Sequence, residues 1–102
     1  DSADLDQVGR YFAVSHQWWS ARGAFEGISV YDISADPYHP TLLRRIAVPG
    51  GVHTVQIDPE VESGRPYAYA NSGGNWKVTI VNILTEGNCP ACRAAAASSR
   101  GR

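Results

Sequence analysis

The feature that most constrains the fold is an internal repeat of short apolar segments. Residues 28–33 (ISVYDI) recur fifty positions later as residues 78–83 (VTIVNI), and residues 11–15 (YFAVS) recur fifty-six positions later as residues 67–71 (YAYAN). The offsets differ because the linker between the two segments is six residues shorter in the second copy. A period of about 50 residues with several strands per unit predicts β-propeller blades or a similar array.

The segments that make up the repeat have the composition of β-strands. They are short, rich in β-branched and aromatic residues, and bounded by Gly, Pro, Asn, Asp or Ser. The only stretch with good helix propensity, residues 93–97, is too short to be a stable helix. The sequence predicts an all-β fold with strands over residues 10–15, 27–33, 41–48, 52–58, 66–71 and 77–83.

Two of these predicted strands carry apolar residues on both faces. In residues 27–33 the aliphatic side chains are joined by Tyr31, and aliphatic side chains almost fill residues 77–83. A strand with one solvated face would alternate more cleanly between apolar and polar residues. We therefore expect these strands to be covered on both faces.

Pro37 and Pro40 end the strand that begins at Gly27. Proline has no amide donor and biases the preceding residue away from helix, so the chain must turn here before the next strand begins. In a four-stranded blade this turn separates the third strand from the outer, fourth strand. Residues 52–58 then form the innermost strand of the next blade.

Residues 27–58 (GISVYDISADPYHPTLLRRIAVPGGVHTVQID) resemble the LVIVD repeat. Its units run from glycine through alternating aliphatics to Asp, an aliphatic and Ser, then Asp-Pro, a spacer and Pro, followed by two more strands. The continuation to residue 83 is similar to bacterial surface β-propeller proteins that carry such repeats. The sequence departs from the pattern at the inserted Ala35, and in the second copy, where Asn82 stands in place of Asp32 and the Asp-Pro turn is missing.

This resemblance implies consecutive four-stranded antiparallel blades of a β-propeller and an exported bacterial protein, either extracellular, periplasmic or on the cell surface. It brings no fixed active-site motif. We divide the chain into a leading segment (residues 1–9), about two blades (residues 10–87) and a tail of Cys, Ala, Ser and Arg composition (residues 88–102). Such a tail is typical of disorder.

Two four-stranded units cannot close a propeller, which usually takes about 4 to 8 blades. An open pair exposes apolar blade faces and unpaired strand edges. We therefore expect an incomplete ring: the chain is a fragment of a longer protein or it assembles, and its partners are the remaining propeller blades or further copies of itself.

The charge balance argues against a nucleic-acid partner. Of the 9 Lys and Arg residues, three lie after Glu86, so the rest of the chain sets six basic residues against 10 acidic ones. A mildly acidic body lacks the basic surface that phosphate recognition needs. No apolar run approaches the roughly 18 residues of a membrane span. We predict no cofactor.

Histidines are the first candidates for a functional site. His53 lies early in the predicted innermost strand, where the side chains of a propeller line the central channel. Its imidazole could bind a metal or a ligand there, or could simply hydrogen-bond to backbone near the channel mouth. His16 opens the longer linker and could approach the same face, whereas His39 lies in the proline turn. None of these spacings marks a zinc site.

The longer linker itself is the second candidate. It carries Trp18, Trp19 and Arg22, and aromatic residues with Arg are typical of binding hot spots. Loops mounted on rigid sheets often carry recognition. Alternatively, one Trp folds back over the blade edge or packs against the neighbouring blade.

Cys89 and Cys92 have the CxxC spacing of redox motifs and of half a zinc ribbon. A second Cys pair is missing, and no βαβ pattern surrounds the motif. Free thiols or a local disulfide are the favoured interpretation, and redox use is a weak hypothesis. The acidic residues 58–62 (DPEVE) lack the spacing of an EF-hand and are interpreted as a solvated turn rather than a calcium site.

The sequence thus predicts a non-catalytic binding or scaffolding module that recognises a protein or a small ligand through blade loops. The alternative is a fragment of a propeller enzyme with a metal in a His-lined channel, around His53 and His16. The predicted binding residues are Trp18, Trp19, Arg22, His16 and His53.

Overall fold

The computed structural model describes residues 2–17, 25–72 and 77–87. Over these residues the regular elements are short strands, with one turn of 3-10 helix. The strands are β1 (Ser2–Val8), β2 (Tyr11–His16), β3 (Gly27–Asp32), β4 (Thr41–Ala47), β5 (Thr54–Ile57), β6 (Tyr67–Ser72) and β7 (Lys77–Asn82), and the 3-10 turn η1 covers Val61–Ser63. The predicted all-β fold class is confirmed.

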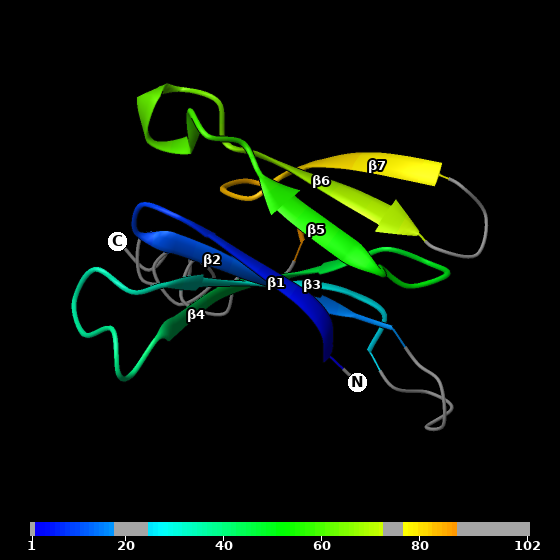
Figure 1. Cartoon of the computed structure of the whole chain (residues 1–102), viewed down its shortest axis with the longest axis horizontal. Coiled ribbons are helices and arrows are strands. Elements are labelled where there is room, and N and C mark those ends of the chain that lie inside the picture. Colours follow the sequence, from blue (N-terminus) through cyan, green and yellow to red (C-terminus); the bar gives the residue numbers. More distant parts are fainter. Residues whose placement is uncertain (1, 18–24, 73–76, 88–102) are drawn as a thin grey trace, which may run out of the picture.

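The strands form two antiparallel sheets that pack against each other (Figure 1). Sheet A has the order β1-β2-β3-β4, and sheet B has the order β5-β6-β7. Consecutive strands are neighbours within each sheet, and the chain passes from sheet A to sheet B between β4 and β5. This order agrees with the predicted succession of antiparallel strands.

β1 lies in residues 1–9, the predicted leading segment, where the sequence predicts no strand. Residues 2–8 (SADLDQV) are mostly polar, so their composition does not mark them as β. β1 nevertheless pairs antiparallel with β2, from Ser2 opposite His16 to Val8 opposite Tyr11. Sheet A therefore includes most of the leading segment, because a neighbouring strand supplies the pairing that local propensity does not signal.

The repeat in the sequence is also a repeat in strand pairing. The β2–β3 pair of sheet A and the β6–β7 pair of sheet B have the same register, so residues that match in sequence occupy matching places in the two sheets. The end pairs are Tyr11 with Asp32 and His16 with Gly27 in sheet A, and Tyr67 with Asn82 and Ser72 with Lys77 in sheet B.

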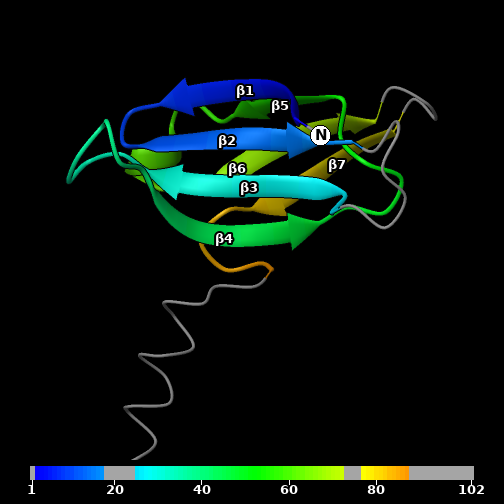
Figure 2. The ribbon, with the colours of Figure 1, turned by 90° about the horizontal axis from the view of Figure 1, so that it is seen from below.

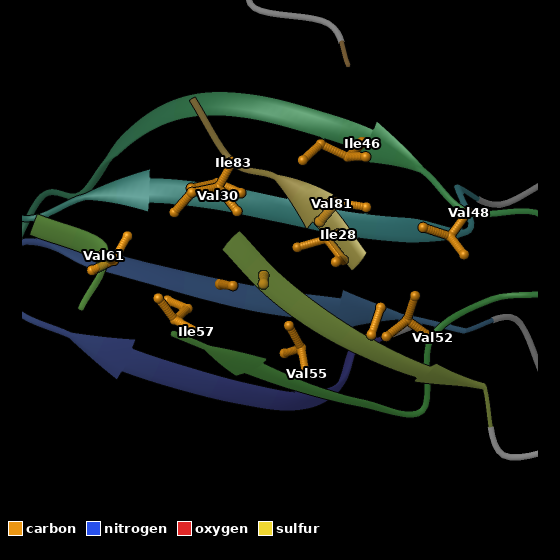
Figure 3. Packing of buried hydrophobic residues seen from close by; sticks show 13 residues of the cluster. Ile28, Val30, Ile46, Val48, Val52, Val55, Ile57, Val61, Val81 and Ile83 are labelled. Atoms are coloured by element: carbon orange, nitrogen blue, oxygen red, sulfur yellow. The ribbon is translucent and has the colours of Figure 1, made fainter. Parts of the chain in front are cut away.

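The hydrophobic core lies between the two sheets (Figure 3). We call the surface of sheet A that faces sheet B its front, and the surface of sheet B that faces sheet A its back. Each large apolar side chain buried there stabilises the fold by about 1.5–3 kcal/mol. The core residues are Ala13, Ile28, Val30, Ile46 and Val48 from the sheet A half of the chain, and Val52, Val55, Ile57, Val61, Ala68, Ala70, Val81 and Ile83 from the sheet B half.

The two sheets are also joined along β1 and β5, which lie side by side and run in the same direction (Figures 1 and 2). The amide of Val55 donates to Asp4 Oδ2 at 3.1 Å, and the amide of Ile57 donates to Asp6 Oδ2 at 2.7 Å. β5 is an edge strand of sheet B. The two carboxylates therefore accept hydrogen bonds that a neighbouring strand would otherwise accept.

The turn between β3 and β4 contains both prolines, as predicted. The amide of Ser34 donates to Asp32 Oδ1 at 2.8 Å, and the amide of Tyr38 donates to Asp36 Oδ1 at 3.0 Å, both of which are Asx turns. Arg10 Nη2 donates to Asp32 Oδ2 at 2.7 Å, and this hydrogen bond is the main cause that lowers the pKa of Asp32 to about 2. The turn is thereby tied to the residue that precedes β2.

Candidate functional site

Two of the predicted histidines lie at the same end of the molecule, where sheet A meets the segment that leads into β5. His16 ends β2, and the amide of Val52 donates to its carbonyl oxygen at 3.1 Å. The hydroxyl of Ser15 donates to the carbonyl oxygen of His53 at 3.3 Å. Backbone contacts thus bring the chain at His16 and at His53 together. His53 precedes β5 rather than lying within it.

The His16 ring packs on the surface of sheet A that faces away from sheet B. Its Nε2 lies 2.8 Å from the hydroxyl of the buried Ser29, and Phe25 meets the ring edge-on at a centroid distance of 5.3 Å. Burial lowers the pKa of His16 from its ordinary 6.5, and the positive charge of Arg45 adds to this effect. The ring is therefore neutral near pH 7.

This lowered pKa predicts a pH dependence of stability. The unfolded chain binds a proton at His16 more readily than the folded chain does, so the free energy of unfolding falls as the pH drops through 6.5, and it stops falling below the lower pKa of the folded chain. A further loss starts below the ordinary 3.8 of Asp32, whose pKa is about 2 when folded. Urea unfolding across this range should show the first loss in the wild type, and it should shrink in His16→Gln. An NMR titration of the His16 ring with a midpoint at or above 6.5 would contradict the prediction.

The His53 ring is exposed and is held by Gln17. Its Nδ1 lies 3.1 Å from Gln17 Oε1. A carbonyl oxygen only accepts, so Nδ1 carries the proton and Nε2 of the neutral ring is the acceptor. The contact thus sets the tautomer of an exposed imidazole, which can accept a hydrogen bond from a ligand.

The structure does not gather the histidines into a metal site. His39 lies in the turn between β3 and β4, at the opposite end of sheet A from His16, and its Nδ1 is 2.7 Å from Asp36 Oδ2. Among the described residues there is no group of three or more His, Cys, Asp or Glu side chains that could hold a metal ion.

Five of the predicted site residues lie outside the described residues. Gln17 and Phe25 are the last and first described residues on either side of the linker that carries three of them. The others belong to the tail. These residues are Trp18, Trp19, Arg22, Cys89 and Cys92.

The acidic segment after β5 has a structural role that the sequence analysis did not foresee. Asp58 is buried at 5% exposure and accepts hydrogen bonds from the hydroxyl of Tyr69, the amide of Glu60 at 2.8 Å and Arg65 Nε at 3.0 Å. These donors lower the pKa of Asp58, the Tyr69 hydroxyl most of all. The carboxylate is engaged by protein donors, so the segment is neither a fully solvated turn nor a calcium site around Asp58.

Two open cavities of about 420 and 400 Å³ lie away from the histidines. The first has Arg10, Tyr11 and Leu84 in its wall, at the end of β2 opposite His16. The second lies beside Asp6 and Tyr69. Two of the charged groups there already have protein partners, since Arg10 is paired with Asp32 and Asp6 accepts the amide of Ile57. Neither cavity was predicted from the sequence.

Comparison with protein-family models, curated proteins and solved structures gives no significant match. The resemblance to the LVIVD repeat therefore stays a prediction. Within the part of the chain that the structure describes, no helix has the length and apolar character needed to cross a bilayer.

Proposed function

We propose that this chain is a non-catalytic binding and scaffolding module, made of successive propeller-type blades, that recognises a protein or a small ligand at the end carrying His16, Gln17 and His53. The observation that carries the proposal is the exposed His53 ring, held in one tautomer by Gln17 where the two sheets meet. A fixed acceptor at the end of a rigid pair of sheets suits recognition.

The blade interpretation is supported by the relation between the sheets. Sheet A is a four-stranded meander, as a propeller blade is, and sheet B repeats the register of its second and third strands. The first strands of the two sheets run side by side, as strands lining one channel would. Placement outside the cytoplasm of a bacterium belongs to the same proposal and rests on the LVIVD resemblance alone.

The metal-enzyme alternative receives no support from the described residues. The His16 ring is engaged with Ser29, and the His53 ring is engaged with Gln17. Among the residues that the structure describes, no third metal-binding side chain joins them in a group that could hold a metal ion.

A binding experiment tests the proposal. The ¹⁵N-labelled chain is screened by NMR against short peptides and small polar molecules. The changes in protein amide chemical shift that a bound ligand causes should be largest at residues 16, 17 and 53. His53→Ala should weaken the binding of such a ligand about fivefold to tenfold, as expected for the loss of one hydrogen bond.

The matched control is His39→Ala, which removes an exposed imidazole at the opposite end of sheet A and should leave the affinity unchanged. The proposal fails if ligands change only the amide chemical shifts of residues that line the cavity beside Arg10 and Leu84. It also fails if His53→Ala binds a ligand as tightly as the wild type does.

A further inference from the structure

Sheet B exposes an apolar surface on the side away from sheet A, which we call its front. Val78 and Ile80 of β7 are 64% and 61% exposed there. Their counterparts in the repeat are Ile28 and Val30 of β3, which are 0% exposed. The same strand pattern is therefore fully buried in one copy and open in the other.

The burial of Ile28 and Val30 has an identifiable cause within the chain. Both lie on the front of sheet A and pack against the back of sheet B, where Val81 lies (Figure 3). Ala68, which pairs with Val81, and Ala70 belong to the same face and to the same core. The chain thus contains one complete front-to-back contact between two sheets that share a register.

The chain also has the two surfaces that a second contact of this kind would join. One is the front of sheet B. The other is the surface of sheet A that faces away from sheet B, which we call its back. On this back face Leu5 is 65% exposed and pairs with Val14, and Phe12 stacks on Tyr31 at a centroid distance of 4.7 Å. Phe25 lies at the end of this face, against the His16 ring.

The polar link between β1 and β5 can be repeated in the same way. Strand pairing places Thr54 and Gln56 of β5 where Asp4 and Asp6 stand in β1. Both side chains carry an acceptor oxygen, as the carboxylates do. Tyr69 occupies the position in sheet B that Ala13 occupies in sheet A. A contact made by the front of sheet B would therefore include a larger side chain at this position than the contact made by sheet A.

We propose that the chain assembles head to tail with further copies of itself, the front of sheet B of one copy packing on the back of sheet A of the next. This goes beyond the proposed ligand recognition, which rests on the exposed His53 ring held by Gln17. A contact between two different surfaces leaves one free surface on each outer copy, so the assembly grows into a ring where the rotation between copies closes and into a filament where it does not. Propellers of about 4 to 8 blades correspond to roughly two to four copies with two sheets each.

Sedimentation of the full chain in the presence of reductant, so that Cys89 and Cys92 form no crosslinks, tests the proposal. The wild type should show a concentration-dependent mass of several chains. Val78→Glu with Ile80→Glu should prevent the front of sheet B from packing on another copy, and Leu5→Glu should prevent the back of sheet A from doing so. Each of these variants should sediment with the mass of one chain. Tyr38→Glu is the control, because Tyr38 is 89% exposed in the turn between β3 and β4 and should keep the assembly.

Mixing the two interface variants separates head-to-tail association from other modes. The Leu5→Glu variant keeps an intact front and the Val78→Glu/Ile80→Glu variant keeps an intact back, so an equimolar mixture should form a dimer that neither forms alone. Circular dichroism should show that both variants stay folded. A wild type that stays monomeric to its solubility limit overturns the proposal. Self-association of either variant alone, which indicates contact between like faces, also overturns it.

Discussion

Replacing Asp4 and Asp6 together by alanine should lower the free energy of unfolding by about 2–5 kcal/mol. The two carboxylates accept the amides of Val55 and Ile57, and no strand of sheet B pairs with that edge of β5. Their loss removes two charge-assisted hydrogen bonds and leaves two partly buried donors without a partner, which costs more than an unformed bond in water. Equilibrium unfolding in urea measures the loss.

The matched control keeps the shape and an acceptor oxygen at both positions. Asp4→Asn with Asp6→Asn should retain more than half of the stability that the alanine pair loses, because an amide oxygen still accepts, though without the charge. Amide exchange should become faster at Val55 and Ile57 in the alanine pair and stay slow at Ala13. Unchanged exchange at both amides would show that the carboxylates do not hold the sheets together.

Ile28→Ala should lower the free energy of unfolding by about 2–5 kcal/mol, whereas Ile80→Ala should change it by less than about 0.5 kcal/mol. The two isoleucines belong to corresponding strands and lie on corresponding faces, but Ile28 is 0% exposed and Ile80 is 61% exposed. Truncating Ile28 opens a cavity between the sheets, while truncating Ile80 removes atoms that already contact water.

Val30→Ala and Val78→Ala form a second pair of the same kind, with the buried valine again the costly one. Unfolding is measured at a dilution at which sedimentation shows single chains. Equal losses at Ile28 and Ile80 would mean that both faces of the repeat are buried in the monomer. A loss at Ile80 that appears only at high concentration would instead agree with the proposed assembly.

The strands that the sequence predicted correctly are those whose composition alone is diagnostic. Residues 27–33 and 77–83 combine β-branched side chains with Gly, Pro or Asn at their ends, and the paired prolines mark the turn after β3. Residues 2–8 were missed because their polar side chains carry no such signal. Two of them are instead used to bond the amides of β5, a role that depends on a strand about fifty residues away.

The candidate site was predicted only as residue types in a region. In the blade interpretation His16 and His53 could approach one face, and the structure brings their backbones together through Val52 and Ser15. The partners of the two rings, Ser29 and Gln17, could not be read from the sequence. Neither contact has a spacing rule, because each joins side chains that meet only after the strands have paired.

The linear pattern determined where strands form, where they end, and that residues 28–33 and 78–83 are copies of one unit. It could not distinguish the buried copy from the exposed one, because Ile28 and Ile80 belong to almost the same alternation of side chains. Only the tertiary structure decided that, by stacking the back of sheet B on the front of sheet A and leaving the front of sheet B uncovered. The physical reason is that the alternation of side chains is a property of a single strand. Burial requires a second surface that packs against the strand and excludes water.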